Sequence, residues 1–156
     1  MSDAVVHLPA DVAAEIRRQC EGAYPLEACG AIFGRGDGSV EPWSVLGIRP
    51  APNQHGDDQR RRYQVPPEFQ VQAERDALAL GQDVIGYFHS HPDHPAQPSE
   101  YDRAHAWFGY VYVICAVAKG AAQALNAFTL DSDGGIFQSV LIESPKETTP
   151  PTQEVR

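Results

Sequence analysis

The chain has 156 residues, of which 42% are hydrophobic and 21% charged, as in ordinary globular proteins. This length fits one compact domain and leaves no room for a second. The formal net charge of -9 gives the surface a field that repels phosphate backbones, which argues against nucleic acid as a partner.

The first third of the chain predicts a helix followed by a hairpin. The helix covers residues 9–20, because proline suits a first helical turn and apolar residues recur every four positions; Gly22 predicts its end. Apolar segments at 28–33 and 40–48 flank the glycine-rich turn 34–38, a pattern typical of paired strands. The turn has neither the lysine nor the following helix of a phosphate-binding loop, so its predicted role is structural.

The middle of the chain predicts a loop, a second helix and a buried strand. Residues 49–59 are rich in proline, asparagine and aspartate and are expected to form a mobile loop. A short strand is expected at 63–65, and the double proline that follows it opens a helix over 66–80. An apolar strand then covers 84–89. Three later segments have similar strand-like content: 111–117, 124–130 and 136–142.

These elements predict a fold of the α/β class: a single layered domain with a central mixed β-sheet flanked by helices. We place this domain at residues 1–143. The remaining segment, 144–156, is polar and rich in proline. It has too few apolar groups to offset the entropy of ordering the chain, so we expect a disordered tail.

Three widely spaced cysteines bear on the cellular compartment. Cys20, Cys29 and Cys115 form neither a C-x-x-C pair nor an even disulfide framework, which favours the reducing cytoplasm. The first residues lack the basic start and apolar core of a signal peptide. Since no apolar run approaches the roughly 20 residues needed to cross a bilayer, we expect a soluble cytoplasmic protein with no membrane partner.

The pattern that carries chemistry is a pair of histidines, His89 and His91, at the end of the predicted strand 84–89. Side chains two apart on a strand point to the same face, so both imidazoles can converge on one ion. Three prolines, beginning with Pro92, oppose regular structure beyond the strand. They predict a loop that brings the chain back, so that Asp102 can supply a carboxylate next to the two histidines. Two imidazoles and one carboxylate suit zinc with an open fourth position.

Structural explanations remain open for the same residues. Ser99 and Asp102 have the spacing of a helix N-cap and its third-position carboxylate, a variant of the capping box that is compatible with metal binding. A histidine pair on a strand is often structural or solvent-facing. His94 and His105 lie near the metal-binding pattern; His105 would share a helix face with Asp102, whereas His94 fits a surface position better.

The stretch from His89 to Asp102 resembles the H-S-H-P…P-S-x-x-D signature of the JAMM metallopeptidases, also called the MPN-plus or Mov34 family. Upstream, residues 24–34 resemble the segment that carries the catalytic glutamate of that family. The resemblance covers about residues 5–143 and implies a short, bacterial-type member with the JAMM/MPN fold, which is related to the cytidine deaminase fold. The H-x-E…P-C-x-x-C pattern of zinc deaminases is absent from the sequence.

The resemblance assigns roles to five residues. It implies one zinc ion per chain, held by His89, His91 and Asp102. It further implies that Glu27 is the general base, which takes a proton from water and later delivers it to the leaving amine. Ser99 would donate a hydrogen bond to the developing oxyanion. Without the resemblance, Glu27 is an ordinary glutamate at the start of a strand.

The implied reaction is hydrolysis of the peptide or isopeptide bond after the C-terminal Gly-Gly of a ubiquitin-like or sulfur-carrier protein. That carrier and its activating enzyme are the implied partners. Other functions stay open: a non-catalytic binding module of the same fold, a zinc hydrolase of small amides, and a cysteine protease that uses Cys29. The cysteine protease leaves Ser99 and Asp102 without a role.

Overall fold

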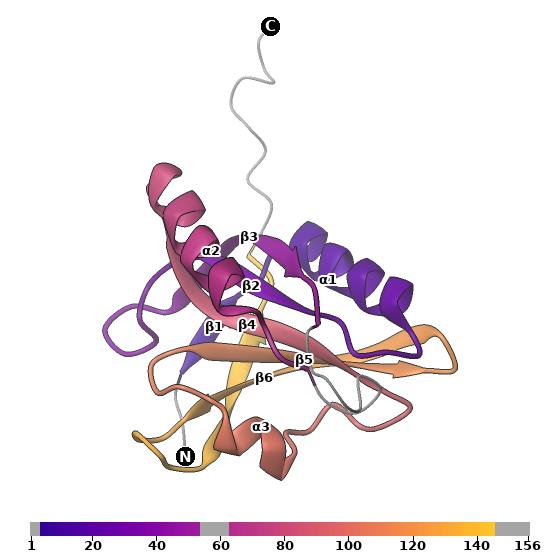
Figure 1. Ribbon diagram of the computed structural model, residues 1–156. Coiled ribbons are helices and arrows are strands. Elements are labelled where there is room, and N and C mark those ends of the chain that lie inside the picture. The colour runs from indigo at the N-terminus through magenta and orange to yellow at the C-terminus, as the bar shows by residue number, and fades with distance from the viewer. Residues whose placement is uncertain (1–3, 54–62, 146–156) are drawn as a thin grey trace, which may run out of the picture.

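The computed structural model of the protein describes residues 4–53 and 63–145. In this part of the chain, seven strands and three helices follow one another (Figure 1). The helices are α1 (Ala10–Ala23), α2 (Pro67–Ala79) and α3 (Glu100–Ala104). The strands are β1 (Val5–His7), β2 (Cys29–Arg35), β3 (Trp43–Ala51), β4 (Asp83–Pro92), β5 (Val111–Ala118), β6 (Ala121–Leu130) and β7 (Phe137–Glu143).

The strands form one mixed sheet whose two ends meet. Their order is β1, β3, β2, β4, β5, β6, β7, and β1 pairs with β7 to close the ring. The pairs β1–β3, β1–β7 and β4–β5 are parallel, and the other four pairs are antiparallel. The predicted α/β class, with a central mixed sheet flanked by helices, is therefore confirmed.

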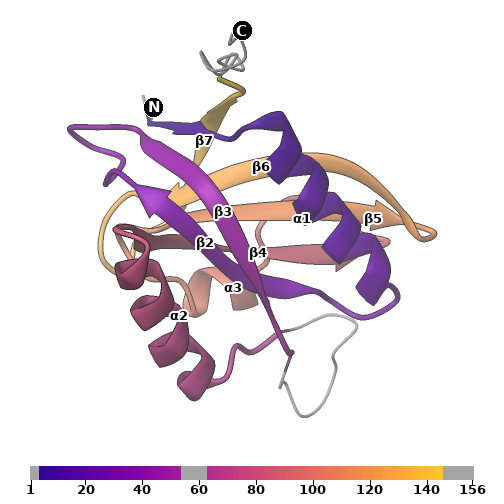
Figure 2. The same cartoon turned by 90° about the horizontal axis from the view of Figure 1, so that it is seen from above.

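Helices α1 and α2 pack on opposite faces of the sheet (Figure 2). Ile16 of α1 is buried in one apolar cluster with Phe88 of β4. Ala73 of α2 is buried in a second cluster with Tyr87, which directly precedes Phe88 in β4. Because side chains alternate along a strand, the odd-numbered residues that follow Tyr87 in β4 face the α2 side.

Several boundaries differ from the sequence predictions. Helix α1 continues to Ala23, past Gly22, because burying its apolar face outweighs the ~1 kcal/mol cost of one glycine. Strand β3 includes residues 49–51, so the prediction of a loop from Arg49 was wrong there. The predicted strand at 63–65 is also wrong, since these residues have no regular structure. Strand β1 was not predicted; three residues are too few for a periodic pattern.

Strand β4 extends beyond its predicted end at His89 and stops at Pro92. The expectation that Pro92 opposes regular structure was therefore wrong. Pro92 pairs with Val117 in the parallel register of β5, and at the last position of a strand its missing N–H interrupts no later ladder bond. Both His89 and His91 consequently lie within the strand.

Two further predictions fall largely on residues outside the described ranges. Residues 54–59 of the predicted mobile loop lie outside the described ranges, and the predicted disordered tail lies beyond Pro145 except for its first two residues. Both stay predictions, as do the boundaries of the domain at 1–143.

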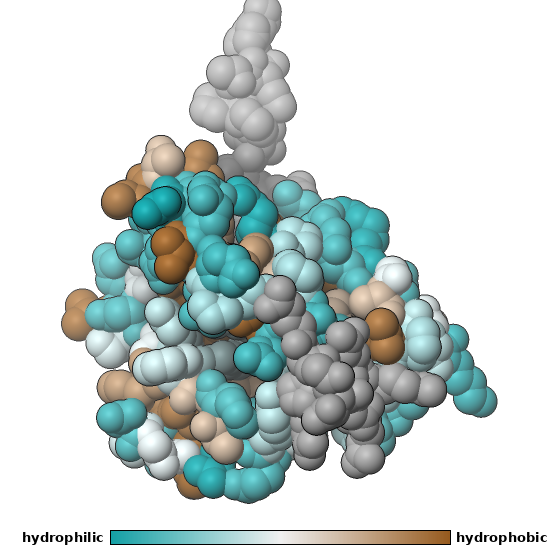
Figure 3. Space-filling model, viewed as in Figure 1, coloured by the Kyte–Doolittle hydropathy of each residue, from teal (hydrophilic) through white to brown (hydrophobic). Residues whose placement is uncertain are grey.

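The surface seen in Figure 3 is mostly hydrophilic. Apolar side chains gather over α2, where Val71, Leu78 and Leu80 are exposed. Such exposed apolar residues are common on folded proteins. Within the described residues, no helix is both long enough and apolar enough to cross a membrane.

Candidate metal centre

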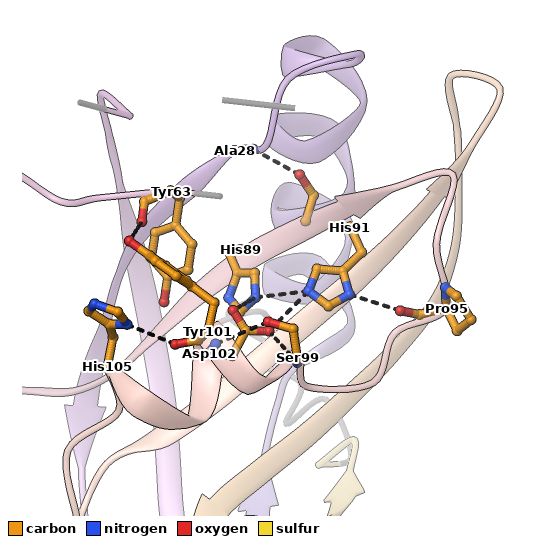
Figure 4. A network of polar contacts seen from close by, with 10 residues as sticks. Ala28, Tyr63, His89, His91, Pro95, Ser99, Tyr101, Asp102 and His105 are labelled. Carbon is orange, nitrogen blue, oxygen red and sulfur yellow. Dashed lines mark hydrogen bonds and ion pairs between the residues drawn. The ribbon is translucent and has the colours of Figure 1, made fainter. Parts of the chain in front are cut away.

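Strand β4 presents two histidines to one point on the α2 side of the sheet. His89 and His91 are 1% and 7% exposed. Their Nε2 atoms lie 3.3 Å apart, and Figure 4 shows the two rings side by side above Asp102 and Ser99. Alternation along the strand predicts this shared direction. The backbone of β4 thus sets the spacing of the two rings.

Helix α3 adds a carboxylate to the histidine pair. Asp102 Oδ1 lies 3.3 Å from Nε2 of His89, and Oδ2 lies 3.1 Å from Nε2 of His91. The same side chain caps the helix, because Oδ2 accepts a hydrogen bond from Ser99 N–H at 2.9 Å. In return, Ser99 Oγ accepts from Asp102 N–H at 3.0 Å. The capping box and the position beside the histidines are therefore both present.

The spacing of the three donor atoms suits a small divalent cation. Zinc binds nitrogen and oxygen ligands at about 2.0–2.1 Å in a tetrahedron, so neighbouring ligand atoms stand about 3.3 Å apart. The two Nε2 atoms lie 3.3 Å apart, and each has its own oxygen of Asp102 nearby: Oδ1 at 3.3 Å from His89 and Oδ2 at 3.1 Å from His91. With one ligand atom taken from each residue, the three atoms all lie within 4.8 Å of one another. The buried group His89, His91 and Asp102 is thus consistent with a metal site.

The protonation states of His89 and Asp102 agree with metal binding, whereas His91 would have to give up its proton to a bound cation. Burial lowers the pKa of His89, which keeps this imidazole neutral. Burial acts the same way on His91, but hydrogen bonds with Asp102 and with the Pro95 carbonyl outweigh it and raise the pKa of His91. Burial alone would raise the pKa of Asp102; the two histidines and the N–H of Ser99 bring it well below its usual value. The carboxylate is therefore ionised, as a metal ligand must be.

Glu27, which precedes β2, is also buried. Next to it, Ala28 N–H donates to Ser90 Oγ at 2.8 Å, and Ser90 N–H donates to the Ala28 carbonyl at 3.1 Å. Ser90 lies between the two histidines, so this pair of bonds sets the Glu27 segment against them. In the antiparallel register Cys29 pairs with the first histidine. Glu27, two residues before Cys29, is therefore level with the second histidine, His91.

Charge balance also favours a cation at this place. Among the described residues, we consider the buried side chains of aspartate, glutamate, lysine, arginine and histidine. They are Glu27, His89, His91 and Asp102. Burial of two carboxyl groups is costly unless a positive charge compensates them. Since this buried set contains neither lysine nor arginine, a divalent cation would supply the compensation.

Ser99 stands at the exposed rim of the centre, at the start of α3. A hydroxyl has one donor proton and two acceptor lone pairs. Because the bond from Asp102 N–H uses a lone pair of Ser99 Oγ, the proton of this hydroxyl is still available to donate. The cap thus holds Ser99 in place without using its donor.

A groove of about 660 Å³ opens beside Glu27. It lies between the last turns of α1 and the end of β3. Its lining combines backbone and side chains of both elements with the segment before β2: Arg18, Gln19, Leu26, Glu27, Pro50 and Asn53 are among the residues that form it. An extended chain could therefore approach Glu27 from this side.

Sequence comparison places the chain in a known family. The model of a family described as prokaryotic homologs of the JAB domain matches residues 9–131. The chain belongs to this family. A relative named desampylase, from Haloferax volcanii, is 35% identical to this JAB-domain protein over 100 residues, which cover 64% of the chain and 68% of the relative. The resemblance to the JAMM, or MPN-plus, family is thereby confirmed.

Two solved structures are similar to this JAB-domain protein over most of its length. The solution structure of a protein from Desulfitobacterium hafniense matches with a TM-score of 0.77 and 27% identity, covering 91% of this chain and 94% of the other. The solution structure of a protein from Salinibacter ruber matches with a TM-score of 0.70 and 36% identity, covering 92% and 94%. The similarity thus includes the strands and helices that hold the candidate metal centre.

Sequence reasoning missed two neighbours of the histidines in this JAB domain. Nδ1 of His91 lies 2.9 Å from the carbonyl oxygen of Pro95. The ring of Tyr63 stacks on His89, with ring centroids 4.4 Å apart. A backbone acceptor leaves no trace in the identity of its residue, and Tyr63 is distant from His89 in the sequence, so no local pattern could have indicated either contact.

The two other histidines near the centre, His94 and His105, lie at exposed positions. His105 is exposed; its Nδ1 lies 2.8 Å from the Tyr101 carbonyl, and its ring stacks on that of Tyr101 with centroids 4.0 Å apart. His94 is exposed in the loop after β4. The side chain of His105 thus contacts Tyr101, the residue before Asp102, and not the carboxylate of Asp102.

Proposed function

We propose that this JAB-domain protein is a zinc-dependent peptidase or isopeptidase. Its substrate would be the amide bond after the C-terminal Gly-Gly of a ubiquitin-like or sulfur-carrier protein. The observation that carries the proposal is the buried trio His89, His91 and Asp102, whose ligand atoms all lie within 4.8 Å of one another. The related protein called desampylase supports an enzymatic role.

In this proposal the trio His89, His91 and Asp102 holds one zinc ion. A zinc ion there supplies Lewis acidity, which polarises a carbonyl oxygen and lowers the pKa of water. Glu27 takes a proton from the attacking water and passes it to the leaving nitrogen when the carbon–nitrogen bond breaks. The hydroxyl proton of Ser99 donates to the carbonyl oxygen as negative charge develops on it.

The enclosure of the centre supports a narrow substrate. His89, His91 and Asp102 are at most 8% exposed, so a scissile carbonyl must approach closely between side chains. Glycine has no side chain and adopts extended conformations easily, so a Gly-Gly tail fits such an approach better than a bulky one. The carrier protein with this tail, and the enzyme that activates the tail, are the implied partners.

A cleavage assay with metal exchange tests the proposal. The parent protein should contain about one zinc per chain and cleave a reporter fused after the Gly-Gly of a ubiquitin-like protein. A strong chelator should abolish cleavage, and added zinc should restore it. Cleavage that survives removal of all metal would contradict the mechanism. Zinc binding without cleavage would favour a binding module, and cleavage of small amides alone would favour a small-amide hydrolase.

Replacing Ser99 separates its two roles. For Ser99→Ala we expect kcat to fall about 10²–10³-fold, because one oxyanion donor is lost. The free energy of unfolding should fall by about 1 kcal/mol, because the N-cap is lost. Ser99→Thr keeps a hydroxyl, so it should retain most of the parent's kcat and most of its free energy of unfolding. If kcat of Ser99→Ala equals that of the parent while stability falls, Ser99 serves only as the cap.

Thiol alkylation tests the cysteine protease that the sequence left open. Burial, with the nearby Glu27 carboxylate, raises the pKa of Cys29 to about 12. At pH 8 the thiolate fraction is then about 10⁻⁴, and alkylation of Cys29 should be about 10³-fold slower than that of free cysteine. We expect iodoacetamide to leave cleavage intact when peptide mass spectrometry finds Cys29 unmodified. Rapid alkylation of Cys29 with parallel loss of cleavage would support the thiol nucleophile.

A further inference from the structure

The two histidines of the candidate metal centre are oriented in different ways. A metal-binding histidine usually donates its second ring N–H to an acceptor that fixes the plane of the ring. His91 follows this rule, since its Nδ1 lies 2.9 Å from the carbonyl oxygen of Pro95. Nδ1 of His89 is buried and has no hydrogen-bond partner among the described residues. No hydrogen bond at Nδ1 therefore fixes the plane of this ring.

Tyr63 is the residue in a position to hold it. Its ring lies against the ring of His89, with centroids 4.4 Å apart and an interplanar angle of 23° (Figure 4). A nearly parallel neighbour at this distance occupies the space through which the imidazole would turn. Tyr63 itself packs against the apolar cluster that contains Cys29 and Tyr87. The stacked ring is thus supported from behind by the core.

The backbone around Tyr63 is attached to the other parts of the centre. Its carbonyl accepts a long hydrogen bond, 3.4 Å, from the hydroxyl of Tyr101, the neighbour of Asp102. The next residue, Gln64, donates its N–H to Asn53 Oδ1 at 3.0 Å. Asn53 Nδ2 in turn donates to the carbonyl of Glu27 at 3.3 Å. Tyr63 therefore sits where the segments that carry Asp102 and Glu27 meet.

We propose that Tyr63 is a positioning residue that holds the His89 ring in its metal-binding orientation by face-to-face stacking, in place of the missing hydrogen bond at Nδ1. The part of Tyr63 that acts is the aromatic ring, and its hydroxyl is dispensable. Phenylalanine should therefore substitute for Tyr63. A branched aliphatic side chain of similar volume, such as leucine, would fill the space without a flat face and would leave the imidazole free to turn.

Zinc affinity of the full chain, measured by competition with a chromophoric chelator, tests this role. We expect Tyr63→Leu to weaken zinc binding about tenfold or more, as loss of an outer partner of a ligand commonly does, and Tyr63→Phe to stay within about twofold of the parent. Tyr110→Leu is the matched control. Tyr110 packs edge-on against Tyr87 at the margin of the same cluster, so its loss should reduce stability in urea and leave zinc affinity unchanged.

The imidazole resonances of His89 in the metal-free protein give a second measure that needs no zinc. They should be sharp in the parent and in Tyr63→Phe, and broadened by ring motion in Tyr63→Leu. Unchanged resonances and unchanged zinc affinity in Tyr63→Leu would overturn the inference, as would equal weakening by Tyr110→Leu. The inference rests on the metal site of the proposed function; a parent protein that binds no zinc would instead refute that function, while the resonances still decide whether Tyr63 orders His89.

Discussion

Replacement of Glu27 by glutamine is expected to lower kcat for a Gly-Gly fusion by about 10²–10⁴-fold, the usual contribution of a general acid–base group. Glutamine has nearly the same shape but cannot accept or deliver the proton. Because Glu27 is not one of the three residues of the candidate metal group, zinc content should remain near that of the parent. The measurements are single-turnover cleavage and zinc content of the purified variant.

Glu41→Gln is the control for the change at Glu27. Glu41 is exposed in the turn before β3, so its loss removes the same charge from the protein without altering the centre. It should cleave like the parent. If Glu27→Gln also cleaves like the parent, another group moves the proton. If Glu27→Gln loses its zinc together with cleavage, Glu27 acts on the metal and not as the base.

Replacement of Asp102 by asparagine is expected to remove zinc binding, and with it all cleavage. In the proposed site, the carboxylate would supply both the third donor and the negative charge that offsets a cation beside two buried histidines. We expect zinc affinity to fall by more than the roughly 100-fold that the loss of an outer partner costs. Chelator competition gives the dissociation constant, and elemental analysis gives the stoichiometry.

A second substitution at Asp102 separates the metal role from the helix cap. The side-chain oxygen of asparagine can still accept from Ser99 N–H, whereas alanine cannot. Asp102→Ala should therefore lose up to about 1 kcal/mol more unfolding free energy than Asp102→Asn in the metal-free state. Equal zinc affinity in the parent and Asp102→Asn would mean that the carboxylate serves the helix alone, and the metal assignment would fail.

The geometry of the trio could be predicted because its determinants are local. Two positions on one strand face share a direction whatever the rest of the fold, and the spacing from Ser99 to Asp102 already specifies a helix start. Glu27 is different. From its own neighbourhood it resembles Glu15, Glu21 and Glu41. Only the family resemblance singled it out, and its place beside the histidines depends on the pairing of Ala28 with Ser90 across two distant strands.

The parts of the fold that could not be predicted depend on contacts between distant segments. Strand β1 exists because β3 and β7 both accept it as a neighbour, and three residues carry no period of their own. Tyr63 was predicted to lie in a short strand, but it has no regular structure and its side chain packs against His89 and the flanking core. Propensity describes fit to a half-buried surface and does not specify which surface is available.

The closure of the sheet by so short a strand has a consequence for self-association. β1 pairs with only Trp43 and Ser44 of β3, so within residues 4–53 and 63–145 the rest of β3 has a neighbour strand on one side alone. An open edge of this kind is a template on which another copy of the chain can add a strand. Pro50 lies in that open half. Since proline offers no N–H to an incoming strand, we expect Pro50 to make this half of β3 a poorer template for such pairing.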